Sequence, residues 1–250
     1  MQSLVNLFAI GGIAFSALGI LLRLVDRRLR RNLADILLSV ALFAIMWYVF
    51  IYLMILTGYI TRIPNLYNKG IPLYYLVAPC AYFYTRLKLY PAERLPRHWY
   101  VHAIPFVLGL VDIMPYAWAS YAEKQALMER LVADIRVGFE HEYGFIHQQW
   151  HYVAKLLLAF VYLMAQWRLL FMVDTGETEI SSKLLFSMYL FTIIYSLFVA
   201  VQVSMVLNIL FNQVQASYIL KDAGQLVWVS GLYLLFSIWI CVGPGIRRMK

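Results

Sequence analysis

RLVDRRLRR, residues 23–31, is a run of nine residues with five arginines that separates two long apolar stretches. Arginines that follow a hydrophobic helix this closely are retained on the cytoplasmic side of a bilayer. The apolar stretch before them, residues 4–22, is therefore predicted to cross the membrane with its N-terminal end outside. Each later segment takes its direction from this first one.

The composition of the chain indicates that lipid is its solvent. Of its 250 residues, 63% are hydrophobic and 14% are charged, and the mean hydropathy is +0.70. A soluble domain of this size has no means of burying so much apolar surface, so the soluble class is excluded. The net charge is +8, and the lysines and arginines lie mainly in the loops expected on one side of the membrane. This distribution indicates membrane topology, with membrane lipid as a partner, rather than nucleic-acid binding.

Seven apolar segments of spanning length predict an all-α, polytopic membrane protein that forms one domain over residues 1–250. They cover residues 4–22, 33–56, 71–87, 99–121, 150–172, 184–211 and 226–242. Alternation of the loops places 14 of the 21 lysines and arginines on the side of the arginine run. The other side receives Arg62, Lys69, Lys124, Arg130, Arg136, Lys155 and Lys221. This bias predicts an N-out, C-in topology.

The longest loop is predicted to lie outside and to contain an amphipathic segment, residues 122–140. Its apolar residues recur at helical spacing, and charged residues occupy the other face. The apolar set is Leu127, Met128, Leu131, Val132, Ile135 and Phe139, and the charged set is Glu123, Lys124, Glu129, Arg130 and Asp134. Such a segment either lies on the outer membrane surface or caps the helix bundle.

Two charges are predicted to lie well inside spans, Asp112 in the fourth and Lys155 in the fifth. Each is eight or nine residues from the outer end of its span, about 12–14 Å deep at 1.5 Å per residue. The two helices are consecutive and antiparallel, so the charges are expected to face each other. A structural ion pair and a ligand or proton site are both consistent with that position.

His147, His151 and Lys155 recur every four residues and form one stripe at the outer end of the fifth span. Together with Asp112 they are the candidate ligand-binding residues, because histidine at such a site responds to pH or metal near neutrality. Two histidines at this spacing can share a metal ion, so His147 and His151 are candidate ligands. The alternative is a hydrogen-bonded histidine pair at the interface. In HQQWH, Gln148 replaces the glutamate that a zinc protease would use as its base.

The sequence carries no sign of enzymatic chemistry. The seventh span has no lysine for a retinal Schiff base, and no phosphate-binding loop, nucleophile elbow or kinase motif is present. No enzyme activity and no cofactor are therefore expected.

Three stretches carry a resemblance to a known family: RRNLADILLSVALFA from Arg30, IPLYYLVAPCAYFYTRLKL from Ile71 and WYVHAIPFVLGLVDIMPYAW from Trp99. They resemble the N-terminal membrane part of bacterial membrane-bound AraC-type transcription regulators. The resemblance implies a sensory or signal-transmitting module of the inner membrane that acts on a cytoplasmic helix-turn-helix domain.

No DNA-binding domain follows the seventh span, so this chain is not expected to bind nucleic acid directly. It is interpreted either as a module truncated from a longer regulator or as a relative without an output domain. A cytoplasmic output domain or protein partner, and a second copy of the chain, are the partners left open. A small-solute transporter or channel subunit, or a structural subunit of a membrane complex, is the alternative function.

Overall fold

The computed structural model describes residues 2–26, 32–91, 94–140, 143–173, 180–211 and 223–242, and this part of the chain contains helices and no strand. The all-α prediction is confirmed there. The long helices are α1 (Gln2–Val25), α3 (Leu33–Leu56), α4 (Ile71–Leu89), α9 (Gln148–Phe171), α10 (Ser182–Phe211) and α12 (Ala223–Val242). The short ones are η1 (Tyr59–Arg62), η2 (Pro64–Leu66), η3 (Trp99–Ala103), α5 (Ile104–Asp112), α6 (Met114–Trp118), α7 (Tyr121–Ala133) and α8 (Val137–Glu140).

Part of the predicted charge pattern lies outside the described residues. This concerns Arg27, Arg28, Arg30 and Arg31 of the arginine run, together with Lys221, Arg247, Arg248 and Lys250. Arg23 belongs to the described part and ends α1 as the basic residue of its last turn.

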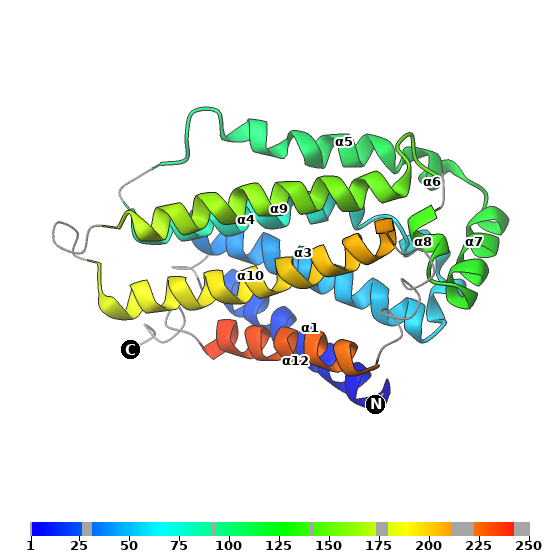
Figure 1. Ribbon diagram of the computed structural model, residues 1–250, viewed down its shortest axis with the longest axis horizontal. Coiled ribbons are helices and arrows are strands. Elements are labelled where there is room, and N and C mark those ends of the chain that lie inside the picture. Colours follow the sequence, from blue (N-terminus) through cyan, green and yellow to red (C-terminus); the bar gives the residue numbers. More distant parts are fainter. Residues whose placement is uncertain are drawn as a thin grey trace.

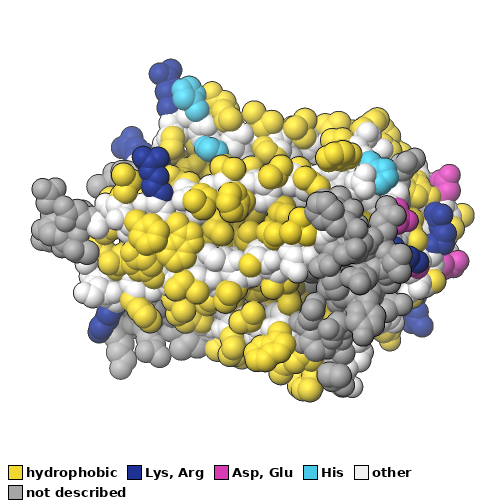
Figure 2. Space-filling view, viewed as in Figure 1, with side chains coloured by type: hydrophobic (Ala, Val, Ile, Leu, Met, Phe, Trp, Pro, Cys, Tyr) yellow, Lys and Arg dark blue, Asp and Glu magenta, His cyan; other side chains and the backbone are white. Residues whose placement is uncertain are grey.

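The long helices lie side by side along the long axis of the molecule (Figure 1), with α7 and α8 across one end. We call this the α7 end and the other the opposite end. On the face in Figure 2, hydrophobic side chains cover the middle and charged side chains gather at the two ends. A lipid bilayer matches this distribution, because its apolar core is bounded by two polar interfaces.

Five helical stretches of the described chain are long and apolar enough to cross a membrane. They are Gln2–Val25, Leu33–Leu56, Trp99–Trp118, Gln148–Phe171 and Ser182–Ser204. The predicted third and seventh spans correspond to α4, with 19 residues, and to the shorter apolar stretch Leu226–Cys241 of α12. The structure thus gives a helical membrane protein with five clear candidate spans.

The predicted fourth span, residues 99–121, is not one continuous helix. It consists of η3, α5 and α6 and ends at Trp118. A proline lies within the first two positions of both α5 and α6, where its missing N–H costs no helical hydrogen bond. Pro115, the second residue of α6, therefore marks the start of a new helix directly after Ile113.

The first and last long helices pack closely through small residues. A Cβ atom on Gly12 would collide with the Tyr233 ring, so glycine at this position lets α1 approach α12. The Ser16 hydroxyl lies 3.0 Å from the Tyr233 hydroxyl and 2.9 Å from the Ser237 hydroxyl. Gly12 and Ser16 of α1 thus contact α12, a helix that is distant in the sequence.

The amphipathic segment is divided into α7 and α8, and it caps the bundle. Leu127, Met128 and Leu131 are fully buried in a core cluster that they share with Ile51 of α3 and Tyr116 of α6. Of the two sequence-based alternatives, capping is the one that this packing supports. The helix starts at a capping box in which the Glu123 N–H donates to the Ser120 hydroxyl and the Ser120 N–H donates to the Glu123 carboxylate. The Ser120 hydroxyl also donates to this carboxylate, and the bonds that the carboxylate accepts lower its pKa below the usual value.

Two residues of the segment depart from the predicted faces. Lys124, expected on the charged face, is buried, and its ammonium donates to the Asn65 side chain at 3.1 Å and to the Ala117 carbonyl at 2.9 Å. Val132, expected on the apolar face, is 41% exposed. Lys124 connects α7 to η2 and α6, because its aliphatic chain packs inward while its ammonium donates to oxygen atoms of Asn65 and Ala117.

Candidate functional site

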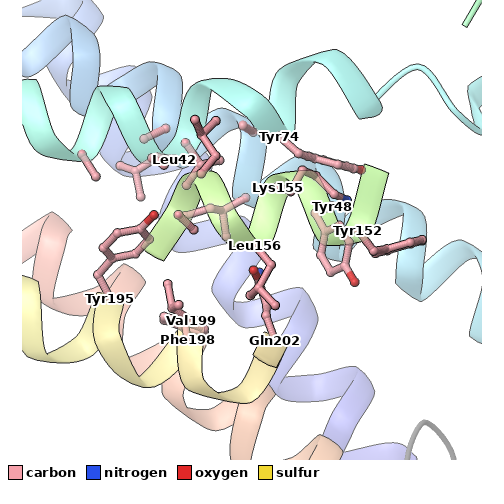
Figure 3. A pocket seen from close by; sticks show the side chains of 18 of the residues that line it. Leu42, Tyr48, Tyr74, Tyr152, Lys155, Leu156, Tyr195, Phe198, Val199 and Gln202 are labelled. Atoms are coloured by element: carbon pink, nitrogen blue, oxygen red, sulfur yellow. The ribbon is translucent and has the colours of Figure 1, made fainter. Parts of the chain in front are cut away.

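An apolar cavity of about 140 Å³ lies inside the bundle, between α3, α4, α9 and α10. Its walls are aliphatic and aromatic side chains such as Leu42, Leu156, Phe198 and Val199, and Phe236 of α12 contributes to its floor. Figure 3 shows these side chains converging from helices of both halves of the chain. The polar groups on its wall are few, and they include Lys155, three tyrosines (Tyr48, Tyr74 and Tyr152) near it, Tyr195 and Gln202.

Lys155 is held in this cavity wall by aromatic rings. Its ammonium lies 4.3 Å from the centre of the Tyr152 ring and 4.9 Å from the centre of the Tyr74 ring. A cation at such distances is attracted by the negative face of each ring. Among the described residues no carboxylate forms an ion pair with Lys155. Within this part of the chain, the cation is therefore positioned without a counter-ion of its own.

A second cavity, of about 80 Å³, lies under the cap formed by α7 and α8. Its wall is more polar, with Asn68 and Gln148 beside Leu131 and Gly138. Five residues line both cavities: Tyr48, Tyr74, Phe139, Tyr152 and Lys155. These five form the partition between a space near the α7 end and the apolar cavity deeper in the bundle.

Asp112 and His151 form a buried hydrogen-bonded chain with Tyr75. The His151 Nε2 atom lies 2.7 Å from the Asp112 Oδ2 atom, and its Nδ1 atom lies 2.8 Å from the Tyr75 hydroxyl. As a carboxylate Asp112 only accepts, so His151 donates from Nε2, and in the neutral ring Nδ1 accepts from the Tyr75 O–H. The chain joins α5, α9 and α4.

The backbone before α9 completes the surroundings of Asp112. The Ile146 N–H donates to its Oδ1 atom at 2.7 Å. Gly144 is required here, because a Cβ atom at this position would lie 2.9 Å from the Asp112 carboxyl carbon. The absence of a side chain thus lets the loop close over a buried carboxylate.

The predicted ion pair between Asp112 and Lys155 is wrong. Asp112 takes His151 and the Ile146 N–H as its partners, whereas Lys155 lies against tyrosine rings. Both are on the α7 half of the bundle, but one turn of α9 separates Lys155 from His151 and directs it to the cavities. The physical reason is that a histidine satisfies the carboxylate from a closer position on the same helix face.

His147 occupies the N-cap position of α9, at the beginning of the predicted stripe. Both ring nitrogens of His151 take part in hydrogen bonds, which leaves no lone pair for a metal ion. The described part of the chain contains no group of three or more His, Cys, Asp or Glu residues able to hold a metal. Of the four candidate residues, the structure joins Asp112 with His151 and places Lys155 on the cavity wall.

A buried ionic cluster at the opposite end was missed by the sequence analysis. Asp35 of α3 is 2% exposed, and it accepts from the Lys88 ammonium of α4 at 3.0 Å. The Arg23 guanidinium of α1 lies 3.9 Å from the same carboxylate and donates to the Ile240 carbonyl of α12 at 3.2 Å. Each of the three charged residues lies within a turn or two of a helix end, where a charged side chain is usually expected to be exposed to water. The sequence feature that could have revealed this cluster is that positive and negative residues occur together at span ends on the side of the arginine run.

The comparisons with known proteins give no relative: no family model, no curated protein and no solved structure matches this chain. Its function therefore has to be argued from the cavities, Lys155 and the buried hydrogen-bonded chain.

Proposed function

We propose that this chain is a sensory or signal-transmitting module of a bacterial inner membrane, with seven transmembrane helices in an N-out, C-in arrangement. The resemblance to the membrane part of AraC-type regulators, which covers nearly the whole chain and is strongest from Arg30 to Trp118, motivates the biological role. The seven-span interpretation adds α4 and α12 to the five clear spans. With 19 residues, α4 is about 28 Å long at 1.5 Å per residue, close to the bilayer core of about 30 Å.

The observation that carries the proposal is the mainly apolar cavity between α3, α4, α9 and α10, with the Lys155 cation at its wall. A transport path requires polar groups at several depths, so that a solute never loses its hydrogen bonds. Beyond Lys155 the cavity wall toward the opposite end consists mostly of apolar residues such as Leu38, Ala81 and Phe191. This favours a pocket that retains a ligand over a passage.

The position of the cavity suggests how occupancy is transmitted. Tyr195, Phe198 and Val199 of α10 form one wall, and α3, α4 and α9 form the others. A ligand that fits only a slightly displaced α10 selects that arrangement, and helix shifts of about 1–2 Å are a common form of such a switch. Since α10 is a 30-residue helix, the displacement reaches its first turn at the opposite end.

The proposed topology predicts which end of the bundle is accessible from outside the cell. Lys69 is exposed at the α7 end and Lys183 is exposed at the start of α10. In a background with Cys80 and Cys241 replaced by alanine, we expect a membrane-impermeant maleimide to label Lys69→Cys in intact cells. Lys183→Cys should react only after permeabilisation. Reaction of Lys183→Cys alone in intact cells would reverse the proposed orientation.

The signalling role predicts that filling the cavity moves the opposite end. Ala159 is buried and lines the cavity, and Ala154 is exposed on the same helix, so Ala154→Leu is a matched control for Ala159→Leu. Spin labels at Leu24→Cys of α1 and Phe186→Cys of α10 report the distance between the two helices. We expect Ala159→Leu to shift this distance by about 2 Å, and Ala154→Leu to leave it unchanged. Equal distance distributions in both variants would remove the support for transmission.

A further inference from the structure

The size of the main cavity limits what it can hold. Its volume is about 140 Å³, whereas pockets for drug-sized ligands begin at about 300 Å³. An engineered apolar cavity of about 150 Å³ in another protein binds benzene. The apolar part of a ligand that fits within this volume therefore contains about six carbons, which is fewer than the acyl chain of a phospholipid contains.

The positive charge of Lys155 at the cavity wall favours a ligand with a negatively charged group. Lys155 presents an ammonium between two tyrosine rings and has no carboxylate partner among the described residues. A carboxylate is the small anionic group that pairs with an ammonium and accepts hydrogen bonds from it. The carboxylate of a ligand would pair with the Lys155 ammonium, and the two tyrosine rings would stay in contact with Lys155.

A buried tyrosine marks the far side of the same cavity. Tyr195 is 8% exposed and lines the cavity, and its hydroxyl has no hydrogen-bond partner in the described part of the chain. Buried hydroxyls are normally hydrogen-bonded. In Figure 3, Tyr195 lies on one side of the cavity and Lys155 toward the other, with Leu156 and Val199 between them. The cavity thus has a polar side chain at each end and aliphatic side chains such as Leu156 and Val199 between them, with Gln202 as a further polar residue of the wall.

We infer that this cavity binds a small carboxylic acid with an apolar body of about six carbons and a hydrogen-bonding group at its far end. The carboxylate pairs with Lys155, the body fills the space between Leu156 and Val199, and the far group bonds the Tyr195 hydroxyl. The biological meaning of this ligand rests on the proposed sensory function, but its binding is measurable without any signal.

The test is calorimetric titration of the full chain in nanodiscs of neutral phosphatidylcholine. The probes are hexanoate, 6-hydroxyhexanoate and the neutral isostere hexanamide. We expect saturable binding of hexanoate, binding of hexanamide that is at least about tenfold weaker, and binding of 6-hydroxyhexanoate that is about two- to tenfold tighter. The first difference reports the charge at Lys155, and the second reports the hydroxyl of Tyr195.

Variants separate the two polar ends. Lys155→Met should weaken both acids by about ten- to a hundredfold, since it removes a charged hydrogen-bond donor. Tyr195→Phe should abolish only the preference for 6-hydroxyhexanoate. Lys69→Met removes an exposed lysine at the α7 end and should change nothing. Lys155→Arg keeps the cation, so retained binding by this variant shows that the loss in Lys155→Met is a loss of charge rather than of folding.

Three results would overturn the inference: no saturable hexanoate binding, wild-type hexanoate affinity in Lys155→Met, or an unchanged hydroxyl preference in Tyr195→Phe. A bilayer phosphate is the other source of an anion for Lys155. Weaker hexanoate binding in nanodiscs that contain phosphatidylglycerol would assign Lys155 to lipid and also overturn the inference. If the acids bind as expected but leave the distance between Leu24→Cys and Phe186→Cys unchanged, the ligand stands and the sensory function fails.

Discussion

Replacing Asp35 with alanine is expected to lower the free energy of unfolding by about 3–5 kcal/mol, because it leaves buried positive charges without their counter-ion. Asp35 is almost fully buried and lies between the Lys88 ammonium at 3.0 Å and the Arg23 guanidinium at 3.9 Å. The three side chains come from α1, α3 and α4, so the same substitution loosens the contacts of three helices at the opposite end. Denaturation of the detergent-solubilised protein, followed by circular dichroism, measures the loss.

Two controls show whether the effect belongs to the cluster. Glu129→Ala removes an exposed carboxylate of α7 and should change the free energy of unfolding by no more than about 0.5 kcal/mol. In a cycle of Asp35→Ala and Lys88→Ala, the double variant should lose less than the sum of the single losses, because Lys88 is then no longer left without Asp35 and only Arg23 keeps an unpaired charge. A loss below about 1 kcal/mol in Asp35→Ala would mean that water reaches this cluster and screens it.

Replacing Asp112 with alanine is expected to cost about 3 kcal/mol of folding free energy, since it leaves one buried donor and one partly buried donor without an acceptor. These donors are the His151 Nε2–H, at 2.7 Å from the carboxylate, and the Ile146 N–H, at 2.7 Å. Asp112→Asn keeps one acceptor oxygen and should lose less. The same unfolding measurement in detergent compares both variants with the unmodified chain.

Double-variant cycles separate the partner found in the structure from the partner predicted from sequence. Asp112→Ala combined with His151→Ala should show a coupling of about 1–3 kcal/mol, as expected for groups in direct hydrogen-bond contact. Asp112→Ala combined with Lys155→Met should be additive within about 0.5 kcal/mol. A strong coupling with Lys155, and none with His151, would restore the predicted ion pair and contradict the arrangement described above.

Hydropathy alone predicted much of the fold, because a bilayer constrains a chain through one simple quantity. Long apolar runs become helices in lipid, since no other local structure satisfies the backbone without water. The stretches that became α1, α3, α9 and α10 were predicted to within a few residues. The apolar spacing in residues 122–140 likewise predicted the face of α7 that contains Leu127, Met128 and Leu131.

The partners of the polar side chains were decided only by the tertiary structure. The spacing of His147, His151 and Lys155 showed that they share one face of a helix, but it contained no information on how that helix is rotated toward α4, α5 and α10. Rotation is set by packing, for example by Gly144 next to Asp112 and by the rings of Tyr74 and Tyr152 beside Lys155. The buried position of Asp35 and the two cavities escaped the sequence for the same reason. Composition and periodicity determine which segments are helices in lipid, whereas side-chain neighbours depend on contacts between helices far apart in the chain.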